Sequence, residues 1–246
     1  IFSDKDPDGQ RRVYGPSNHY ALLCGAADIE MENSVWSNME SLKCESGYKL
    51  FSPALGKQHI EKVGRIASGD TPDGQWENAS VYNHGSHGFM LRALAHSKKG
   101  NQFETVMQYL LPYNQRFHPV EKTKTSPYAI VNCYQNLPMN KHRGGMTFLT
   151  GSIAMAVRAV YDWMFGLRLK QDIIEFCPCF KLGNVERKLS INIRGKKLNI
   201  VYTGINTDKS FMLHLNGKQL SDKKTDKYNI SFDSLSKDNT LEVIFK

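Results

Sequence analysis

The feature that most constrains the fold is a change in hydrophobic spacing near residue 172. Before that point, apolar residues recur at helical intervals, as at Phe103, Val106 and Leu110. After it, short stretches alternate apolar and polar residues, at 189–194, 198–202, 211–215, 228–232 and 241–245. Asn216-Gly217, between two of these stretches, is a strong hairpin signal. The chain is therefore predicted to be mainly α with a C-terminal β domain.

The first two thirds are expected to hold helices over about residues 17–29, 34–42, 85–96, 102–111 and 150–166. Long polar loops join these helices, and loops of that length are more often functional than idle. The alternating stretches are expected to form a small antiparallel β-sandwich. We place the helical domain at residues 1–170 and the β domain at residues 171–246.

Charge and hydropathy exclude some classes of partner. The 246 residues carry a net charge of +8, and many of the lysines lie after residue 180, between the apolar residues of the predicted strands. That placement is typical of the outer face of a sheet, so we predict no nucleic-acid partner. No apolar run is long enough to span a membrane, so no membrane partner is predicted.

The start of the chain limits what can be predicted about processing and compartment. The chain begins with Ile1 and shows no signal-peptide pattern, so we expect part of a longer product or a processed one. The compartment is not fixed, although the cytoplasm is favoured over secretion.

His96, His118 and His142 have no cysteine or carboxylate at metal-ligand spacing, so no metal site is predicted.

Three loops of the helical part carry polar side chains. The first contains Glu77, Asn78 and His84, the second contains Gln135, and the third runs from Arg143 to residue 152. Polar groups on loops of a rigid apolar scaffold are where sites usually form. The alternative for the first loop is an ordinary polar loop whose histidines cap a helix and bond to the backbone.

The third loop ends in Thr150-Gly151-Ser152 at the start of a predicted helix. Backbone N–H groups at such a point, helped by a nearby imidazole and arginine, can bind an anion. The alternative is plain helix capping by Thr150 or Ser152, which is far more common. The residues by themselves leave both possibilities open.

Several short motifs occur in a fixed order along the chain, namely Gly64-Arg65-Ile66, Glu77-Asn78, His84, Ser126-Pro127-Tyr128, Arg143-Gly144-Gly145, Thr147 and Thr150-Gly151-Ser152. Together they resemble glycoside hydrolase family 94, the group of cellobiose, chitobiose, cellodextrin and cyclic β-1,2-glucan phosphorylases. Residues 165–168 and 174–178 resemble the passage by which that family leaves its barrel for a C-terminal β domain. The resemblance covers about residues 1–205.

The resemblance implies that residues 1–170 form the second half of an (α/α)6 barrel and that residues 171–246 form a jelly-roll-like sandwich. It also implies inverting phosphorolysis of a β-glucoside or oligosaccharide by inorganic phosphate, which gives a sugar 1-phosphate. Phosphate is then a co-substrate, and no cofactor is expected. By position, His84, Thr150 and Gly151 match the phosphate-binding residues of the family.

The sugar site implied by the resemblance includes Glu77, Asn78, Gln135 and Arg143. The family's general acid is an aspartate well upstream, and no matching segment occurs in this chain. We therefore expect the acid and the other barrel helices to come from the remainder of a parent chain or from a complementary fragment. The 246 residues alone are predicted to have no phosphorolytic activity.

The chain departs from the family at some positions. Ala79-Ser80 stands where the family has two glycines, Ser126 where it has glutamate, and Met146 where it has an aromatic residue. These departures keep two alternatives open. One is an inverting hydrolase on the same barrel with Glu77 as general base, and the other is an inactive homologue that only binds carbohydrate. His87 matches no family motif and is predicted to be structural. The sugar, the linkage and the oligomeric state are not fixed.

Overall fold

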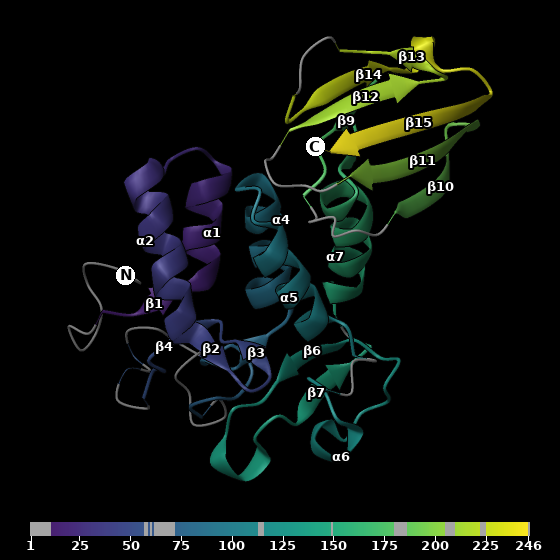
Figure 1. The fold of residues 1–246 in the computed structure, drawn as a ribbon. Helices are drawn as coiled ribbons and strands as arrows, with labels where there is room; N and C mark the ends of the chain where they lie inside the picture. The colour runs from purple at the N-terminus through teal and green to yellow at the C-terminus, as the bar shows by residue number, and fades with distance from the viewer. Residues whose placement is uncertain are drawn as a thin grey trace. The chain divides into compact units, whose positions relative to one another are not determined.

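A computed structural model describes residues 11–56, 59, 61, 72–112, 116–148, 150–179, 186–204, 210–221 and 225–245. The motif Gly64-Arg65-Ile66 therefore lies outside the described residues. The helices and strands follow one another along the chain as β1 (Val13–Tyr14), α1 (Gly15–Leu23), α2 (Ile29–Met39), η1 (Glu40–Leu42), β2 (Lys43–Cys44), β3 (Gly47–Tyr48), β4 (Phe51–Ser52), β5 (Val81–Tyr82), η4 (His84–Gly88), α4 (Phe89–His96), α5 (Gly100–Leu110), α6 (Val120–Thr123), β6 (Val131–Tyr134), η5 (Pro138–Asn140), β7 (Gly144–Thr147), α7 (Ser152–Arg158), η6 (Ala159–Met164), β8 (Leu167–Leu169), β9 (Ile173–Phe176), β10 (Arg187–Ile193), β11 (Lys196–Gly204), β12 (Phe211–Leu215), β13 (Lys218–Gln219), β14 (Tyr228–Ser231), η7 (Phe232–Ser234) and β15 (Asp238–Phe245) (Figure 1).

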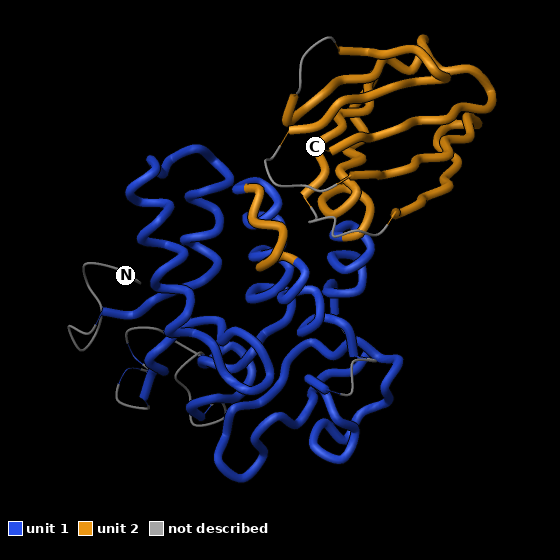
Figure 2. Tube along the Cα trace, in the orientation of Figure 1, with its two compact units in different colours: residues 1–97, 104–159 blue, residues 98–103, 160–246 orange. Residues whose placement is uncertain are grey.

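The chain divides into two compact units (Figure 2). Unit 1 consists of Ile1–Ser97 and Glu104–Ala159, and unit 2 of Lys98–Phe103 and Val160–Lys246. Strand β8 ends before residue 171 and already pairs with β9, so the β structure begins ahead of the predicted boundary. In the part of the chain that the structure describes, no helix has the length and hydrophobicity needed to span a membrane.

The break between the first two helices of unit 1 falls earlier in the chain than expected. Gly25 has a φ of +68°, which ends α1 with a left-handed residue. The Asp28 side chain then accepts a hydrogen bond of 2.8 Å from the Met31 N–H and caps α2. The helix predicted over residues 17–29 therefore ends at Leu23, and the helix predicted over residues 34–42 begins at Ile29, because these two signals lie inside the apolar pattern.

Unit 1 also contains a small antiparallel sheet in segments that were expected to be loops. Strands β5, β6 and β7 form a three-stranded sheet in that order, with Val81 opposite Tyr134 and Val131 opposite Thr147. All four residues of β6 are buried. A strand buried on both faces shows no alternation, so the periodicity gave no signal for it.

The main sheet of unit 2 has the order β10-β11-β15-β12-β13. Two-residue turns close its hairpins, Arg194-Gly195 between β10 and β11 and Asn216-Gly217 between β12 and β13. All four turn residues have φ between +50° and +79°. The hairpin predicted at Asn216-Gly217 is confirmed.

The prediction of a purely antiparallel β domain is wrong for one strand pair, because β15 runs parallel to β11 and antiparallel to β12. The last strand is inserted between two earlier strands. A second, three-stranded sheet has the order β14-β9-β8. Buried side chains of both sheets form one apolar cluster, which includes Phe176, Phe211 and Phe245.

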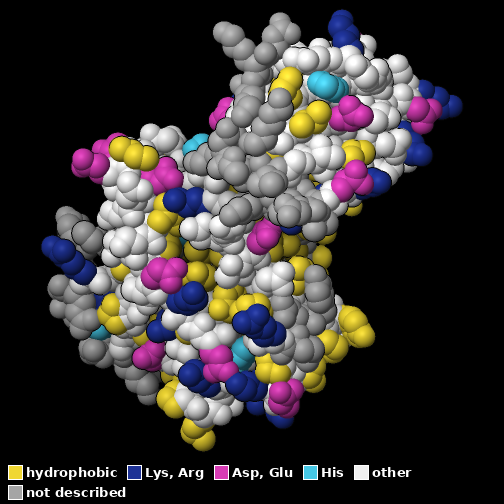
Figure 3. Space-filling view, in the orientation of Figure 1, with side chains coloured by type: hydrophobic (Ala, Val, Ile, Leu, Met, Phe, Trp, Pro, Cys, Tyr) yellow, Lys and Arg dark blue, Asp and Glu magenta, His cyan; other side chains and the backbone are white. Residues whose placement is uncertain are grey.

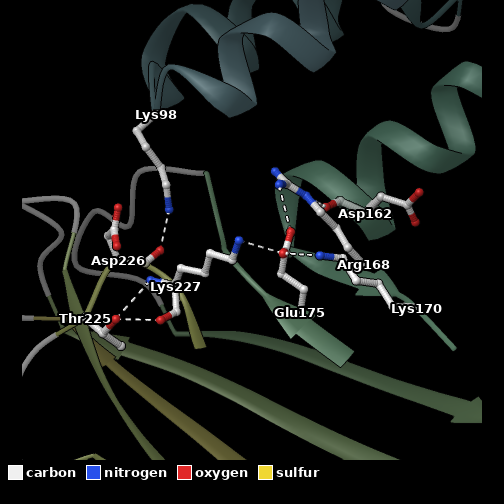
Figure 4. A network of polar contacts seen from close by, with 8 residues as sticks. All are labelled: Lys98, Asp162, Arg168, Lys170, Glu175, Thr225, Asp226 and Lys227. Carbon is white, nitrogen blue, oxygen red and sulfur yellow. Dashed lines mark hydrogen bonds and ion pairs between the residues drawn. The ribbon is translucent and has the colours of Figure 1, made fainter. Parts of the chain in front are cut away.

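A buried carboxylate holds the smaller sheet together (Figure 4). The Glu175 side chain on β9 is 6% exposed and pairs with Arg168 at 3.3 Å, Lys170 at 2.7 Å and Lys227 at 2.7 Å. Figure 4 shows Arg168 and Lys170, from β8 and the residue after it, and Lys227, from just before β14, converging on Glu175. The Lys98 Nζ donates a hydrogen bond of 2.6 Å to the backbone carbonyl of the residue before Lys227. This network therefore ties β8, β9 and the start of β14 to the segment that follows α4.

Candidate functional site

The three polar loops identified in the sequence meet at one sheet. Strand β5 follows Glu77 and Asn78, β6 precedes Gln135, and β7 follows Arg143. The order β5-β6-β7 places the second loop between the first and the third. The fold of unit 1 thus brings together segments that are far apart in the sequence.

His84 lies against the backbone of Gly151. The half-buried imidazole begins the π-helix η4, and its ring centroid is 5.5 Å from that of Phe89. A methyl group placed on Gly151 would be 3.3 Å from Cε1 and 3.4 Å from Nδ1 of His84. Within the residues that the structure covers, no hydrogen bond to the His84 ring is found. The imidazole is therefore positioned beside the backbone at the start of α7.

Thr150 is held by a small network of hydroxyl and amide groups. Its Oγ1 donates to Asn132 Oδ1 at 3.3 Å and lies 2.7 Å from Ser152 Oγ. It also accepts a hydrogen bond of 3.1 Å from the Ser152 backbone N–H. This last contact is the local bond that the capping alternative expects, although the cap position itself falls on Gly151. The Thr150 hydroxyl is oriented by the protein before any ligand binds.

Asn132 is a site residue that the sequence reasoning missed. It lies in the middle of β6, and its Nδ2 donates a hydrogen bond of 3.2 Å to the Tyr82 hydroxyl on β5. Its backbone carbonyl accepts a hydrogen bond from the Asn83 N–H. An amide inside the apolar run 129–134 was the available signal, because a buried amide needs partners. Asn132 connects β5 to the loop that contains Thr150.

Asn78 and Glu77 have different surroundings. The buried Asn78 amide accepts a hydrogen bond of 2.9 Å from the Leu55 N–H and donates one of 2.8 Å to the Leu55 carbonyl. Asn78 thus fixes the loop to the backbone at residue 55. Glu77 is half-buried, and burial followed by the charge of Glu77 raises the pKa of the Cys133 thiol to about 12. The proposed contact of Asn78 and Glu77 with substrate stays a prediction.

Gln135 and Arg143 lie opposite each other where the loop between β6 and β7 begins and ends. The Gln135 N–H donates to the Arg143 carbonyl at 2.9 Å. The Gln135 side chain is buried, yet its Oε1 has no hydrogen-bond partner among the described residues. An unpaired buried acceptor costs about 1–3 kcal/mol, so such an atom calls for a partner such as a ligand hydroxyl or a water. The Arg143 side chain is exposed.

Left-handed backbone conformations concentrate in the loops of this site. Five non-glycine residues there have positive φ, namely Trp76 (46°), Ala79 (61°), His142 (72°), Met146 (53°) and Phe148 (68°). Such conformations cost of order 1–3 kcal/mol each and are found where the surrounding structure enforces them, often at binding sites. Ala79 and Met146 are among the positions where the chain departs from the family motifs.

His87 is structural, as the sequence reasoning favoured. Its Nε2 accepts the Tyr48 N–H at 3.1 Å, so Nδ1 carries the proton and donates to Asn83 Oδ1 at 2.7 Å. Burial, followed by the charges of His118 and His19, lowers the pKa of His87 to about 3. The described residues also contain no group of three histidine, cysteine or carboxylate side chains that could hold a metal ion.

Comparison with known proteins identifies the family of the chain. Residues 5–166 match the Glycosyl hydrolase 94 superfamily, catalytic domain. Cellobionic acid phosphorylase of Neurospora crassa is 24% identical over 205 residues, which are 81% of this chain and 25% of that protein. Solabiose phosphorylase of Paenibacillus borealis is 29% identical over 171 residues, which are 68% of this chain and 21% of that protein.

The chain thus spans about a quarter or less of the length of these two relatives. Residues 77–78, 84, 135, 143 and 150–151 all lie within the range that matches the family. The resemblance noted in the sequence is confirmed at the level of the family. The chain belongs to the glycosyl hydrolase 94 superfamily.

Proposed function

We propose that this chain supplies the phosphate-binding wall, and part of the sugar-binding wall, of an inverting glycoside phosphorylase. The observation that carries the proposal is the His84 imidazole lying against the backbone of Gly151, next to the oriented hydroxyl of Thr150. An imidazole and a backbone N–H can donate hydrogen bonds to phosphate oxygens, and the Thr150 hydroxyl can do so when its single proton turns from Asn132 Oδ1 to the phosphate. Both relatives are named phosphorylases, which favours phosphorolysis over hydrolysis.

The reaction assigned here is a single displacement at the anomeric carbon of a β-glucoside or oligosaccharide. An oxygen of inorganic phosphate forms a bond to that carbon, while the bond to the glycosidic oxygen breaks and an acid protonates the leaving oxygen. The product is a sugar 1-phosphate of inverted configuration. His84, Thr150 and Gly151 would hold the phosphate, and no cofactor is required.

The sugar is assigned to Glu77, Gln135 and Arg143. The unpaired Oε1 of Gln135 would accept a hydrogen bond from a sugar hydroxyl, and Arg143 would donate. Asn78 would support Glu77 by fixing their shared loop to the backbone of Leu55. Protonation of the glycosidic oxygen is assigned to an aspartate that is not among these 246 residues.

We infer that unit 1 is part of an (α/α)6 barrel completed by the remainder of a parent chain or by a complementary fragment, and that the two sheets of unit 2 form a sandwich. Exposed apolar side chains on the helices of unit 1 support the first inference. They include Ile29 (70% exposed), Met31 (55%), Ile153 (45%) and Val157 (53%), the last two being one turn apart on α7. Figure 3 shows apolar side chains at several places on the surface.

Titration of the chain with inorganic phosphate, followed by ³¹P NMR, tests the phosphate wall. We expect binding that His84→Ala weakens at least tenfold. The matched control is His96→Ala, since His96 is exposed at the end of α4 and should leave binding unchanged. Equal affinity in the two variants would remove His84 from the phosphate site.

Product analysis with the parent protein separates the possible activities. Sugar 1-phosphate that forms only when phosphate is present supports phosphorolysis. Free sugar released without phosphate, and lost in Glu77→Gln, would instead show the hydrolase. Glycan binding without turnover, unaffected by His84→Ala and Thr150→Ala, would show an inactive binding protein. Release of sugar 1-phosphate by the 246 residues alone would overturn the assignment of the acid to another segment.

A further inference from the structure

A pair of buried histidines lies at the loop that joins β6 to β7. His118 and His142 are each 1% exposed, and His118 Nδ1 is 3.1 Å from His142 Nε2. The His118 ring stacks on Tyr134, the last residue of β6, with centroids 4.3 Å apart and planes 7° apart. The His142 ring meets Tyr134 edge-on at 5.5 Å. Both imidazoles therefore contact the strand that leads into Gln135.

The contacts of the pair determine where its protons lie. His118 Nε2 contacts the backbone carbonyl of Tyr109, which can only accept, so Nε2 carries the proton. In a neutral ring His118 Nδ1 is then an acceptor, and His142 Nε2 must donate to it. His142 Nδ1 is left as an unprotonated nitrogen that has no hydrogen-bond partner in the described chain. It faces Glu45 Oε1 at 3.9 Å, beyond hydrogen-bond distance.

The surroundings favour the neutral form of both rings. Burial lowers the pKa of His118 to about 4. The hydrogen bond to the Tyr109 carbonyl acts in the opposite direction, and the charge of His142 lowers the pKa further. Burial also lowers the pKa of His142, and Lys122 and Lys141 act in the same direction while Glu45 opposes them. A first proton taken up at His142 Nδ1 would face Glu45 and leave the bond between the rings intact. Protonation of His118 Nδ1 would break it.

The pair is joined directly to the two candidate sugar residues. The His142 backbone N–H donates to the Gln135 carbonyl at 2.8 Å, and the Gln135 N–H donates to the Arg143 carbonyl at 2.9 Å. His142 holds a left-handed φ of 72° between them. Anchoring the His142 ring thus fixes a strained backbone position adjacent to Arg143 and opposite Gln135.

We propose that His118 and His142 are positioning residues, whose mutual hydrogen bond holds the β6–β7 hairpin so that Gln135 and Arg143 stand at fixed positions for substrate. The inference rests on the proposed function only for the identity of the ligand. It goes beyond the matched family positions, because the sequence reasoning gave these histidines no role.

Two amide substitutions of His142 test the hydrogen bond itself. His142→Gln places an NH₂ donor near the position of Nε2, whereas His142→Asn places its amide near Nδ1 and cannot reach His118. A left-handed backbone favours asparagine over glutamine, so backbone preference alone predicts that the hairpin is more stable in the Asn variant than in the Gln variant. The proposed hydrogen bond between the two histidines predicts instead that the hairpin is more stable in the Gln variant.

Hydrogen exchange of the Gln135 and His142 amides is the readout. We expect His142→Asn to accelerate exchange about tenfold, the factor for the loss of one hydrogen bond of about 1.4 kcal/mol, and His142→Gln to stay within about threefold of the wild type. His96→Asn is the control for an exposed histidine. Equal acceleration in the Gln and Asn variants would overturn the proposal, as would ¹⁵N shifts showing a proton on His118 Nδ1.

Cellobiose titration separates this inference from the proposed function. If the wild-type chain binds cellobiose, His142→Asn should weaken binding and His142→Gln should retain it. If the wild type binds none while the exchange and ¹⁵N results hold, the pair stands and the assigned sugar class fails.

Discussion

Removing the charge of Glu175 should destabilise unit 2 by about 2 kcal/mol. Burial by itself would raise the pKa of this carboxyl group, but hydrogen bonds and charges of Lys170 and Lys227 outweigh burial and lower the pKa from 4.5 to about 2. A difference of about 2.5 between unfolded and folded pKa corresponds to roughly 3 kcal/mol at neutral pH. Glu175→Gln keeps the shape of the side chain and removes the charge.

The expected loss is smaller than 3 kcal/mol because the cations can be hydrated in the variant. Lys170 and Lys227 are 53% and 51% exposed, whereas the carboxylate is 6% exposed. Breaking a fully buried pair costs about 3–5 kcal/mol, and a surface pair contributes about 0–1 kcal/mol. A buried anion with half-exposed cations lies between these limits, which gives about 2 kcal/mol.

Amide exchange in β8, β9 and β14 measures the effect without requiring that both units unfold together. A loss of about 2 kcal/mol predicts exchange about thirtyfold faster in Glu175→Gln at pH 7. Glu186→Gln is the matched control, because Glu186 is 49% exposed and pairs with Lys188 at the surface, at 2.8 Å. It should change exchange less than threefold.

The pH dependence of the stability difference tests the role assigned to Glu175. The folded-state pKa of Glu175 is depressed, so its contribution is complete above about 4.5 and is lost as the pH falls toward about 2. The difference in urea stability between wild type and Glu175→Gln should therefore shrink across that interval. A difference that persists at pH 2, or a variant that behaves like Glu186→Gln, would refute the assigned role of the network.

Three other substitutions test separate features of the two units. Gly166→Ala should abolish the native circular dichroism of unit 2, because Gly166 has a φ of +76° and a methyl group there would lie 2.2 Å from the Cys177 carbonyl carbon. Asn78→Ala should lower the free energy of unfolding by about 2–3 kcal/mol in thermal denaturation, since it leaves a backbone donor and acceptor unpaired. Gly151→Ala should weaken phosphate binding at least tenfold in ³¹P titrations, with stability changed by less than about 0.5 kcal/mol. The added methyl would press on the His84 ring while the backbone φ of −71° suits alanine.

The β domain shows what local sequence signals can and cannot predict. Alternation predicted the strands, and Asn216-Gly217 predicted a hairpin, because each depends on neighbours a few residues apart. The insertion of β15 between β11 and β12 depends on residues about 40 positions apart in sequence, such as Leu198 and Asn239. Turn chemistry contains no information on such pairing, so the parallel pair was not predictable in this way.

The candidate site shows the same limit in a different form. Glu77, His84, Gln135 and Thr150 were identified from residue type and motif order. The sheet that joins their loops was not, since β6 is buried throughout and β7 begins with two glycines. Asn132 was missed for the same reason, although it contacts both Tyr82 and Thr150.

The strained residues explain why the site loops could not be derived from local preference at all. Tryptophan, methionine and phenylalanine have no preference for the left-handed region, so only packing can hold Trp76, Met146 and Phe148 there. The Trp76 ring occupies space that a side chain on Gly145 would need, since a methyl at Gly145 would lie 2.7 Å from its Cζ3. The conformation of the first loop thus requires that β7 is already paired with β6. It follows that the proposed phosphate-binding and sugar-binding walls form only with the β5-β6-β7 sheet, and that a peptide of either loop should not retain these backbone angles.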